Sequence, residues 1–332
     1  MTRSPKFDVV GIGNAIVDVI ARAEDDFLVA NGIRKGGMTL IDEQAAARLY
    51  QSMGSATVAS GGSAANTMVG LASLGGRAAF IGKVRNDEPG SAFRHDIGAV
   101  GVHFPTPAAT SGAPTARCLV LVTPDGERTM STYLGACVEL GPLDIDAALI
   151  ADAHIVYLEG YLWDPPQAKE AFRQASQAAH AAGARVALTL SDSFCVDRYR
   201  DEFLELIRTG VIDIVFANES ELHALYQTSD FETAVNALRK ERLLSFVTRS
   251  AEGCLVVDHG ASIAVPSAPI EQLIDTTGAG DLFAAGALFG LARGKSLEQC
   301  AAIGALAAAE VIQHIGARPA RSLADLLAQS AI

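Results

Sequence analysis

The glycine-rich turn near the C-terminal end reads Asp275-Thr276-Thr277-Gly278-Ala279-Gly280-Asp281, and the apolar run 282–290 follows it directly. The first amides of a helix lack partners inside the helix, and the aligned peptide dipoles give that end partial positive charge. Because Gly278, Ala279 and Gly280 carry almost no side chain, an anion such as a phosphoryl group can approach their N–H groups closely. We therefore predict an anion hole at residues 278–280.

Asp281 would place a carboxylate beside that anion hole, at the start of the apolar helix. A carboxylate next to bound phosphate is repulsive unless it has a chemical task, such as accepting a proton from an attacking hydroxyl. An ordinary helix cap followed by a buried helix would explain a shorter Asp-Leu-Phe segment. The full seven-residue run favours phosphate handling, with Asp281 as a general base.

The seven-residue run resembles the C-terminal signature of the ribokinase-like (PfkB) family of small-molecule kinases. The resemblance implies that Asp281 is the catalytic base and that the amides of residues 278–280 cradle the transferred phosphoryl group. It also implies an α/β fold, namely a three-layer α/β/α arrangement with a mainly parallel central sheet and a small β-sheet lid. We expect one kinase domain over residues 1–332, with the lid formed by segments at about 15–42 and 103–135.

The alternation of strand and helix patterns from residue 144 onward favours the same fold. We predict strands near 154–158, 185–190, 212–216 and 244–248. We predict helices near 167–182, 199–208, 219–226 and 231–241. Such alternation implies right-handed crossovers and a parallel sheet that is covered on both faces. The spacing of Gly286 and Gly290 is predicted to let the apolar helix lie close to this sheet.

A second glycine motif, Gly61-Gly62-Ser63-Ala64-Ala65-Asn66, opens a predicted helix over 63–74. A tight strand–helix turn would explain the glycines, but not an asparagine on the buried side of an alanine-rich helix. A buried amide needs partners, and substrate hydroxyls would supply them. This motif resembles the N-terminal signature of the same family, and two signatures in the expected order are stronger evidence than one. We predict that Asn66 and the Gly62 backbone bind substrate.

The first predicted strand ends in a glycine turn at Asn14, and the apolar segment 16–20 follows with Asp18 in its middle. A dinucleotide-binding fingerprint would need glycine at position 16, so Ile16 excludes it. Aspartate is disfavoured inside a strand. A turn or edge position would explain Asp18, and so would binding of a vicinal diol, because a carboxylate accepts two hydrogen bonds. The resemblance assigns Asn14, Ile16 and Asp18 to the substrate.

A hairpin predicted over 117–133 carries Arg128. This arginine is either a solvated hairpin charge or, as the resemblance implies, a side chain of the substrate site that can reach the phosphates. Tyr161, Leu162 and Ile16 could form an apolar wall for a base, and a role in the core is an equal alternative for each.

Asn218 and Glu221 end a predicted strand and start a helix. Their spacing is that of a helix capping box. In the resembled family the same spacing holds phosphate and Mg²⁺-bound water, which suits a hard cation that keeps its waters. The resemblance therefore places Asn218 at ATP and Glu221 at Mg²⁺ through water. It also assigns ATP contacts to a set of small or hydroxyl-bearing residues: Thr248, Ser250, Gly253 and Thr277. Relatives usually carry glycine where this chain has Ser250.

Composition excludes several other classes of protein. The net charge of -12 argues against nucleic acid or anionic membrane as the main partner. The five cysteines are widely spaced with no Cys-x-x-Cys pair, which is typical of reduced thiols, and no signal peptide precedes residues 7–10. We therefore expect a cytoplasmic protein. A Walker A loop, a Gly-x-Ser-x-Gly elbow and paired histidine ligands are all missing, which disfavours P-loop, serine-hydrolase and zinc chemistry.

Within the family, the segment from Gly11 to Asp18 and the segment from Tyr157 to Trp163 are most similar to the adenosine-kinase branch. The resemblance implies ATP-dependent phosphorylation of a 5′-type primary hydroxyl on a nucleoside, with ATP and Mg²⁺ as cofactors. Conversion of adenosine to AMP is the favoured reaction. A ribokinase- or fructokinase-type sugar kinase is the alternative, and a non-catalytic nucleoside or sugar binder is a third hypothesis. A homodimer is left open.

Overall fold

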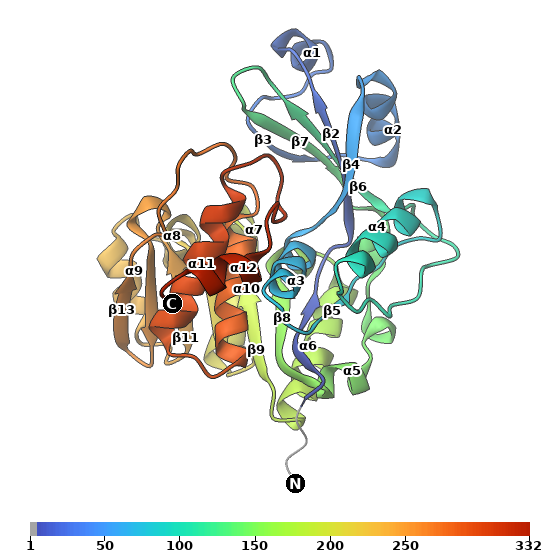
Figure 1. The fold of residues 1–332 in the computed structure, drawn as a ribbon. Coiled ribbons are helices and arrows are strands. Elements are labelled where there is room, and N and C mark those ends of the chain that lie inside the picture. Colours follow the sequence, from blue (N-terminus) through green and yellow to red (C-terminus); the bar gives the residue numbers. More distant parts are fainter. Residues whose placement is uncertain (1–4) are drawn as a thin grey trace.

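The computed structural model describes residues 5–332, and its larger part is built around an eight-stranded sheet (Figure 1). The strand order is β13-β12-β11-β10-β9-β8-β1-β5. The six neighbouring strands β5, β1, β8, β9, β10 and β11 are parallel to one another. Strands β12 and β13 add an antiparallel hairpin beside β11, at one edge of the sheet. The strand bounds are β1 Phe7–Ile12, β5 Ala78–Ile81, β8 Ala153–Glu159, β9 Arg185–Thr189, β10 Ile214–Asn218, β11 Leu244–Thr248, β12 Cys254–Asp258 and β13 Ala261–Val265.

Each face of this sheet has its own hydrophobic core. One core joins the sheet to α6 (Pro166–Ala181), α7 (Ser193–Arg208), α8 (Glu219–Tyr226) and α9 (Phe231–Leu238). The other joins it to α3 (Ser63–Ser73), α4 (Glu88–Ala99), α10 (Ala279–Ala292) and α11 (Leu297–Val311). Since strands buried on both faces are expected to be continuously apolar, the pattern of β1, buried at every position, fits its central place. The predicted three-layer fold is confirmed.

The glycines of α10 serve a different contact from the one we predicted. A Cβ on Gly286 would lie 2.6 Å from the α11 backbone at Ile303 and Gly304, and one on Gly290 would lie 2.8 Å from the Cys300 sulfur. These glycines therefore let α10 pack closely against α11, and the expectation that they face the sheet is wrong. The reason is that α10 is buried all round, so periodicity alone could not tell which neighbour each side would meet.

A separate five-stranded sheet stands above the large sheet in the order β3-β7-β6-β2-β4 (Figure 1). Its strands are β2 Ile16–Arg22, β3 Gly37–Leu40, β4 Ala56–Gly61, β6 Ala116–Val122 and β7 Arg128–Tyr133. Helices α1 (Asp25–Ala30) and α2 (Glu43–Ser52) cover it and share a small core with it. Strand β4 was not among the segments we expected in the lid. Conversely, we expected the lid to include the segment from residue 103 onward, but His103 and Ala109 form bridges with Ala79 and Arg85. This part of the segment therefore lies next to the large sheet.

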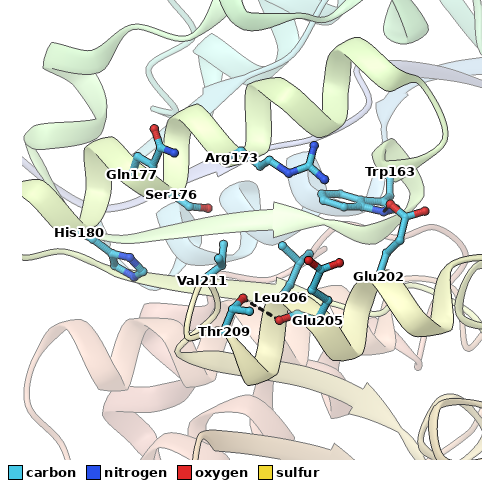
Figure 2. Close-up of a pocket in the computed structure, with 10 residues that line it drawn as sticks. All are labelled: Trp163, Arg173, Ser176, Gln177, His180, Glu202, Glu205, Leu206, Thr209 and Val211. Atoms are coloured by element: carbon cyan, nitrogen blue, oxygen red, sulfur yellow. Dashed lines mark hydrogen bonds between the residues drawn. The ribbon is translucent and has the colours of Figure 1, made fainter.

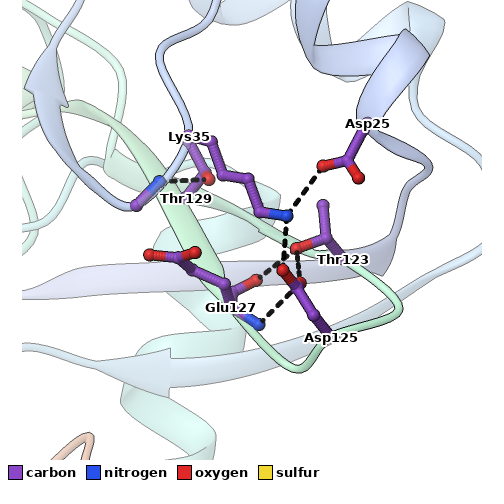
Figure 3. Close-up of polar contacts among 7 residues, drawn as sticks. Asp25, Lys35, Thr123, Asp125, Glu127 and Thr129 are labelled. Carbon is purple, nitrogen blue, oxygen red and sulfur yellow. Dashed lines mark hydrogen bonds and ion pairs between the residues drawn. The ribbon is translucent and has the colours of Figure 1, made fainter.

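An ion-pair cluster joins three parts of the small sheet's rim (Figure 3). The Lys35 ammonium lies 2.8 Å from an Asp25 carboxylate oxygen and 2.6 Å from an Asp125 oxygen. The Thr123 hydroxyl donates a further hydrogen bond of 2.6 Å to Asp125. These contacts lower the pKa of Asp125 and raise the pKa of Lys35. The cluster ties α1 and the loop before β3 to the β6–β7 turn.

Helix α7 starts earlier in the structure than the sequence pattern predicted. We predicted a start near 199, whereas the helix begins at Ser193 because the Asp192 carboxylate accepts a hydrogen bond of 2.6 Å from the Cys195 amide. Tyr199 has φ -122°, so a kink lies at the predicted start. The remaining short elements are α5 Ala147–Ala151, α12 Leu323–Gln329 and the 3₁₀ turns Gly135–Glu139, Pro142–Asp144, Gly160–Trp163 and Ser250–Glu252. None of the helices within residues 5–332 is long and apolar enough to cross a membrane.

Candidate active site

Asp281 occupies the third position of α10 and is held by two side chains of α3. One carboxylate oxygen accepts a hydrogen bond of 2.6 Å from the Ser63 hydroxyl, and the other accepts one of 3.1 Å from the Asn66 Nδ2. Burial raises the pKa of Asp281, while these two hydrogen bonds favour the ionised form. The two glycine motifs of the sequence therefore meet at one carboxylate.

The turn before α10 leaves amides open toward this carboxylate. Gly278 caps the helix with φ 80°, and a Cβ there would lie 2.7 Å from the Ala317 backbone. The Ala279 amide turns back to the Thr276 carbonyl at 3.2 Å. Among residues 5–332, no protein acceptor lies within hydrogen-bond reach of the Gly278, Gly280 and Asp281 amides. A Cβ on Gly280 would meet no atom within 4 Å. The helix N-terminus thus offers donors and free space to an anion.

Arg128 reaches this turn from the small sheet. Its Nη1 donates a hydrogen bond of 3.0 Å to the Thr277 hydroxyl, and its Nη2 lies 3.0 Å from an Asp275 oxygen. Asp275 in turn accepts hydrogen bonds from the Thr277 amide at 3.0 Å and the Gly316 amide at 2.9 Å. The Arg128 and Asp275 side chains are 12% and 8% exposed, so this is a desolvated pair. A cation of the small sheet therefore lies beside the anion hole.

Asp18 points from β2 toward the same region. It is paired with Ala59 on β4 and with Cys118 on β6, and a Cβ on Gly61 would overlap its carboxylate. Desolvation raises the pKa of Asp18 to about 6; the charges of Arg318 and Arg128 oppose this rise and the charge of Asp281 adds to it. Burial therefore destabilises the ionised form of the Asp18 carboxyl in this region.

Asp18→Asn is expected to raise stability at high pH. The pKa of Asp18 is about 6 in the folded chain against an ordinary value of 3.8, so the native state binds this proton more tightly. The contribution of Asp18 to stability therefore falls as pH rises from about 4 to 6. We expect the variant to gain about 2–3 kcal/mol at pH 8 and about 0.5 kcal/mol or less at pH 4. Denaturant unfolding at both pH values measures this, with the exposed Asp201→Asn as control; a gain that is equal at both pH values would contradict it.

Asn14 and Glu159 form a buried polar clamp below the site. Glu159 accepts hydrogen bonds from the Asn14 side chain at 2.7 Å, the Asn14 amide at 3.3 Å and the Ala64 amide at 2.8 Å. Burial raises the pKa of Glu159 to about 7. Gly62, at φ 98°, lies so close that a Cβ would overlap the Asn14 carbonyl. The clamp joins the turn after β1 to the first turn of α3, which carries Ser63 and Asn66.

The three residues predicted for an apolar wall have different locations. Leu162 is 1% exposed and packs in the core beneath α6, away from Asp281. The Tyr161 hydroxyl donates a hydrogen bond of 3.2 Å to the Ser191 carbonyl, and its ring is half-buried. Ile16 is half-buried and packs against the core that contains α3 and α10. Ile16 and Tyr161 keep exposed surface for a ligand, and Leu162 does not.

Asn218 and Glu221 form the predicted capping box at the start of α8. The Asn218 oxygen accepts a hydrogen bond of 2.8 Å from the Glu221 amide, and a Glu221 oxygen accepts one of 3.0 Å from the Asn218 amide. Burial raises the pKa of Glu221 to about 7, with further contributions from the charges of Asp192 and Asp281. A nearby cation would relieve this repulsion, so the site fits Mg²⁺. The described residues contain no cluster of three metal-ligating side chains.

Three further predicted ATP residues lie at the end of β11 and in the turn that follows it. The Thr248 hydroxyl contacts the Ala217 carbonyl at 3.4 Å, and Gly253 adopts φ 86° against the Val265 carbonyl. Ser250 adopts φ 51°, a left-handed conformation that costs a side-chain-bearing residue about 1–2 kcal/mol. A glycine at this position would adopt the same conformation without that cost.

Ser250→Gly is expected to raise stability by about 0.5–1 kcal/mol, because relief of the left-handed strain exceeds the added freedom of the unfolded chain. Ser250→Ala, the control, removes the same hydroxyl but keeps the strained φ, so it should bring no gain. Thermal unfolding measures both. A gain shared by both variants would show that the hydroxyl, rather than the backbone, is the unfavourable feature.

Sequence reasoning assigned no role to Glu159 or Arg318. Arg318 follows α11 in a loop, and its Nε donates a hydrogen bond of 3.4 Å to the Asn66 oxygen. The only signal for Glu159 is a carboxylate at the end of an otherwise apolar strand. Nothing in the sequence around Arg318 indicates that it returns to the start of α3.

A cavity of about 180 Å³ lies between α6 and α7, lined by Trp163, Arg173, Glu202 and their neighbours (Figure 2). It contains none of the residues around Asp281, so it is distinct from the candidate active site.

Residues 37–323 match the family described as pfkB family carbohydrate kinase. The adenosine kinase of Sinorhizobium meliloti is 56% identical with a TM-score of 0.93, over 98% of this chain and 100% of that chain. A probable sugar kinase from Rhizobium etli CFN 42 is 52% identical with a TM-score of 0.93, over 98% of both chains. Adenosine kinase 2 of Arabidopsis thaliana is 27% identical over 344 residues, covering 95% of this chain and 97% of the relative.

These similarities extend over nearly the whole chain and agree with the adenosine-kinase branch that the sequence predicted. The family match covers both glycine motifs, the Arg128 hairpin and the capping box. The chain therefore belongs to the pfkB family of carbohydrate kinases, phosphotransferases that take a phosphoryl group from ATP and pass it to an alcohol.

Proposed function

We propose that the chain phosphorylates the 5′-type primary hydroxyl of a nucleoside, with adenosine as the preferred acceptor and AMP as the product. The observation that carries this proposal is the position of Asp281, a buried carboxylate with open amides beside it and Asp18 facing the same region. The 56% identity with an adenosine kinase supports the choice of a nucleoside.

In the proposed mechanism, one carboxylate oxygen of Asp281 accepts the proton of the acceptor hydroxyl. The hydroxyl oxygen then forms a bond to the γ-phosphorus of ATP, and the bond from that phosphorus to the ADP oxygen breaks. The protein supplies mainly position and electrostatics, because phosphoryl transfer involves little other covalent chemistry. The open amides of Gly278 and Gly280, together with the Arg128 guanidinium, stabilise negative charge on the transferred group. The Ala279 amide, which we also predicted for the anion hole, is already bonded to the Thr276 carbonyl.

We assign the phosphate donor, ATP, to residues at the ends of β10 and β11, in the turn after β11 and in the turn before α10. Asn218, Thr248, Ser250, Gly253 and Thr277 would contact ATP. Glu221 would hold Mg²⁺ through water. When bound, Mg²⁺ neutralises charge on the phosphates.

Asp18 and Asn66 are proposed to bind the ribose hydroxyls. A vicinal diol can donate both protons to one carboxylate, which compensates the desolvation that raises the pKa of Asp18. Asn14, the Gly62 backbone, Ile16 and Tyr161 would complete the acceptor side. Closure of the small sheet over the ribose would exclude water and so limit ATP hydrolysis.

Asp18→Ala is expected to weaken acceptor binding, raising KM about 10²-fold with a smaller change in kcat, since its hydrogen bonds are present in both the ground state and the transition state. Initial rates over a range of nucleoside concentrations measure the split. An unchanged KM would contradict the proposed diol contact.

A sugar kinase of the same family is the second candidate, and the 52% identity with a probable sugar kinase favours it. Both candidates have the same base and the same anion hole and differ in the acceptor alone. Purified protein should be assayed for ADP release with adenosine, inosine, guanosine, ribose and fructose, and each product identified by ³¹P NMR. We expect the highest kcat/KM with adenosine; a preference for free sugars over all nucleosides would contradict the proposal in favour of a sugar kinase.

A further inference from the structure

We propose that Arg318 is a positioning residue that fixes the orientation of the Asn66 amide and thereby keeps Asp281 ready to accept a proton. The inference rests on the proposed role of Asp281 as base. It assigns a function to the loop between α11 and α12, which carries Arg318 to the start of α3.

That loop is held against the site by buried backbone contacts. Glu310, which is 6% exposed, accepts hydrogen bonds from the Ala320 amide at 3.0 Å and the Arg321 amide at 2.9 Å. The Gly316 amide donates to Asp275 at 2.9 Å, which joins the loop to the glycine-rich turn. Arg318 lies between these anchors, so its position is set by the fold.

The donors and acceptors along the chain of contacts allow one orientation of Asn66. A guanidinium only donates, so the Asn66 atom facing Arg318 at 3.4 Å must be the oxygen. The Nδ2 group then faces Asp281 at 3.1 Å and donates to it. A carboxylate that receives this hydrogen bond and another from Ser63 at 2.6 Å is favoured in its ionised form. Only the ionised form can act as a base.

Without Arg318, the Asn66 amide can rotate by half a turn and present its oxygen to Asp281. An amide oxygen facing a carboxylate is repulsive unless the carboxylate takes up a proton and donates it. Asn66 would then favour the protonated acid. We therefore expect loss of Arg318 to raise the pKa of Asp281 and to reduce the fraction of enzyme with a competent base at neutral pH.

The guanidinium is well suited to this task. It stays charged, although desolvation lowers the pKa of Arg318 to about 10. Asp18 and Asp96 lie near enough to oppose that shift. Within residues 5–332, the buried Nη2 of Arg318 has no hydrogen-bond partner. This nitrogen of the guanidinium thus remains available to donate a hydrogen bond.

Other ionisable groups also interact with Asp281, and the proposal requires that they stay in place. They come from β2, β8, the 3₁₀ turn after β8, and α8: Asp18, Tyr157, Glu159, Tyr161 and Glu221. None of these groups has a hydrogen bond to Arg318. The Arg318 charge does lower the pKa of Asp18, so the titration of Asp18 is followed alongside that of Asp281 in each variant.

The test is a titration of the Asp281 carboxyl by ¹³C NMR in protein labelled at aspartate, with Asp281→Asn giving the assignment. Arg318→Met should raise the pKa of Asp281 by about one unit, and Arg318→Lys should restore most of the original value. Arg321→Met is the matched control, because that side chain is exposed in the same loop. Thermal unfolding confirms that each variant is folded.

A double-mutant cycle separates the amide from a direct effect of charge. In an Asn66→Ala background, Arg318→Met should shift the Asp281 titration by less than a third of its effect in the parent protein. An equal shift in both backgrounds, or no shift in either, would overturn the proposal. With substrate present, the acidic limb of the kcat profile of Arg318→Met should move to higher pH by the same amount.

The titration needs no substrate, so it is independent of the acceptor that the enzyme prefers. If no nucleoside or sugar is phosphorylated but the cycle shows coupling, the proposed function fails and the positioning role stands. If turnover is robust and the cycle shows no coupling, the proposed function stands and the positioning role of Arg318 fails.

Discussion

Replacement of Asp281 by Asn should lower kcat about 10³-fold, because the amide keeps the shape of the carboxylate but cannot accept a proton. The KM values for acceptor and ATP should change by no more than about threefold, since the loss falls on the transition state. Steady-state kinetics with the preferred acceptor measure both quantities. Asn at 281 also removes a buried charge whose pKa is raised, so the variant should be at least as stable as the parent.

A matched control is available in α12. Asp325 likewise occupies the third position of its helix, but it is exposed and faces no other functional residue. Asp325→Asn should therefore leave kcat unchanged. Near-normal turnover in Asp281→Asn would show that another group accepts the proton, and the role of the carboxylate would then be structural.

Gly280→Ala should lower kcat/KM about 10²-fold while the protein becomes slightly more stable. The added methyl group meets no protein atom within 4 Å, and position 280 has no left-handed φ, so the fold tolerates it. Alanine in a helix is favoured over glycine by about 0.5–1 kcal/mol. The methyl would instead occupy the space through which a phosphoryl group approaches the open amides, and losing one such donor typically costs about 10²–10³ in rate.

The expected combination of higher Tm and lower activity distinguishes a blocked anion hole from a damaged fold. Gly98→Ala in α4 is the matched control, because its Cβ also meets no atom within 4 Å and its φ is not left-handed. That variant should gain stability and keep full activity. If Gly280→Ala behaves in the same way, the open end of α10 does not hold the transferred group.

The features that the sequence predicted well are those that arise from neighbouring residues. The glycine-rich turn specifies the start of α10, because Gly278 adopts a left-handed conformation and is followed at once by buried apolar residues. The four predicted strands after residue 150 are present with small shifts of boundary. The capping box at Asn218 is likewise local and was predicted correctly.

The features that the sequence missed depend on contacts between distant segments. Strand β4 is buried only at its last two positions, so its pattern gave no clear signal, and it is ordered by its pairing with β2 and its contact with α4. The ion pair of Arg128 with Asp275 joins a strand of the small sheet to the loop before α10. Glu159 and Arg318 act on residues of α3 that lie far away in the chain, and no spacing rule could have joined them.

The central claim is that the open amides at the start of α10 hold the migrating phosphoryl group while Asp281 receives the proton. A crystal structure of the protein with adenosine, ADP and a metal fluoride that mimics this group tests it most directly. We predict the fluoride atoms within hydrogen-bond distance of the Gly278 and Gly280 amides, and the 5′ hydroxyl within such distance of the Asp281 carboxylate. A fluoride complex bound elsewhere, or a 5′ hydroxyl directed at another group, would contradict the account.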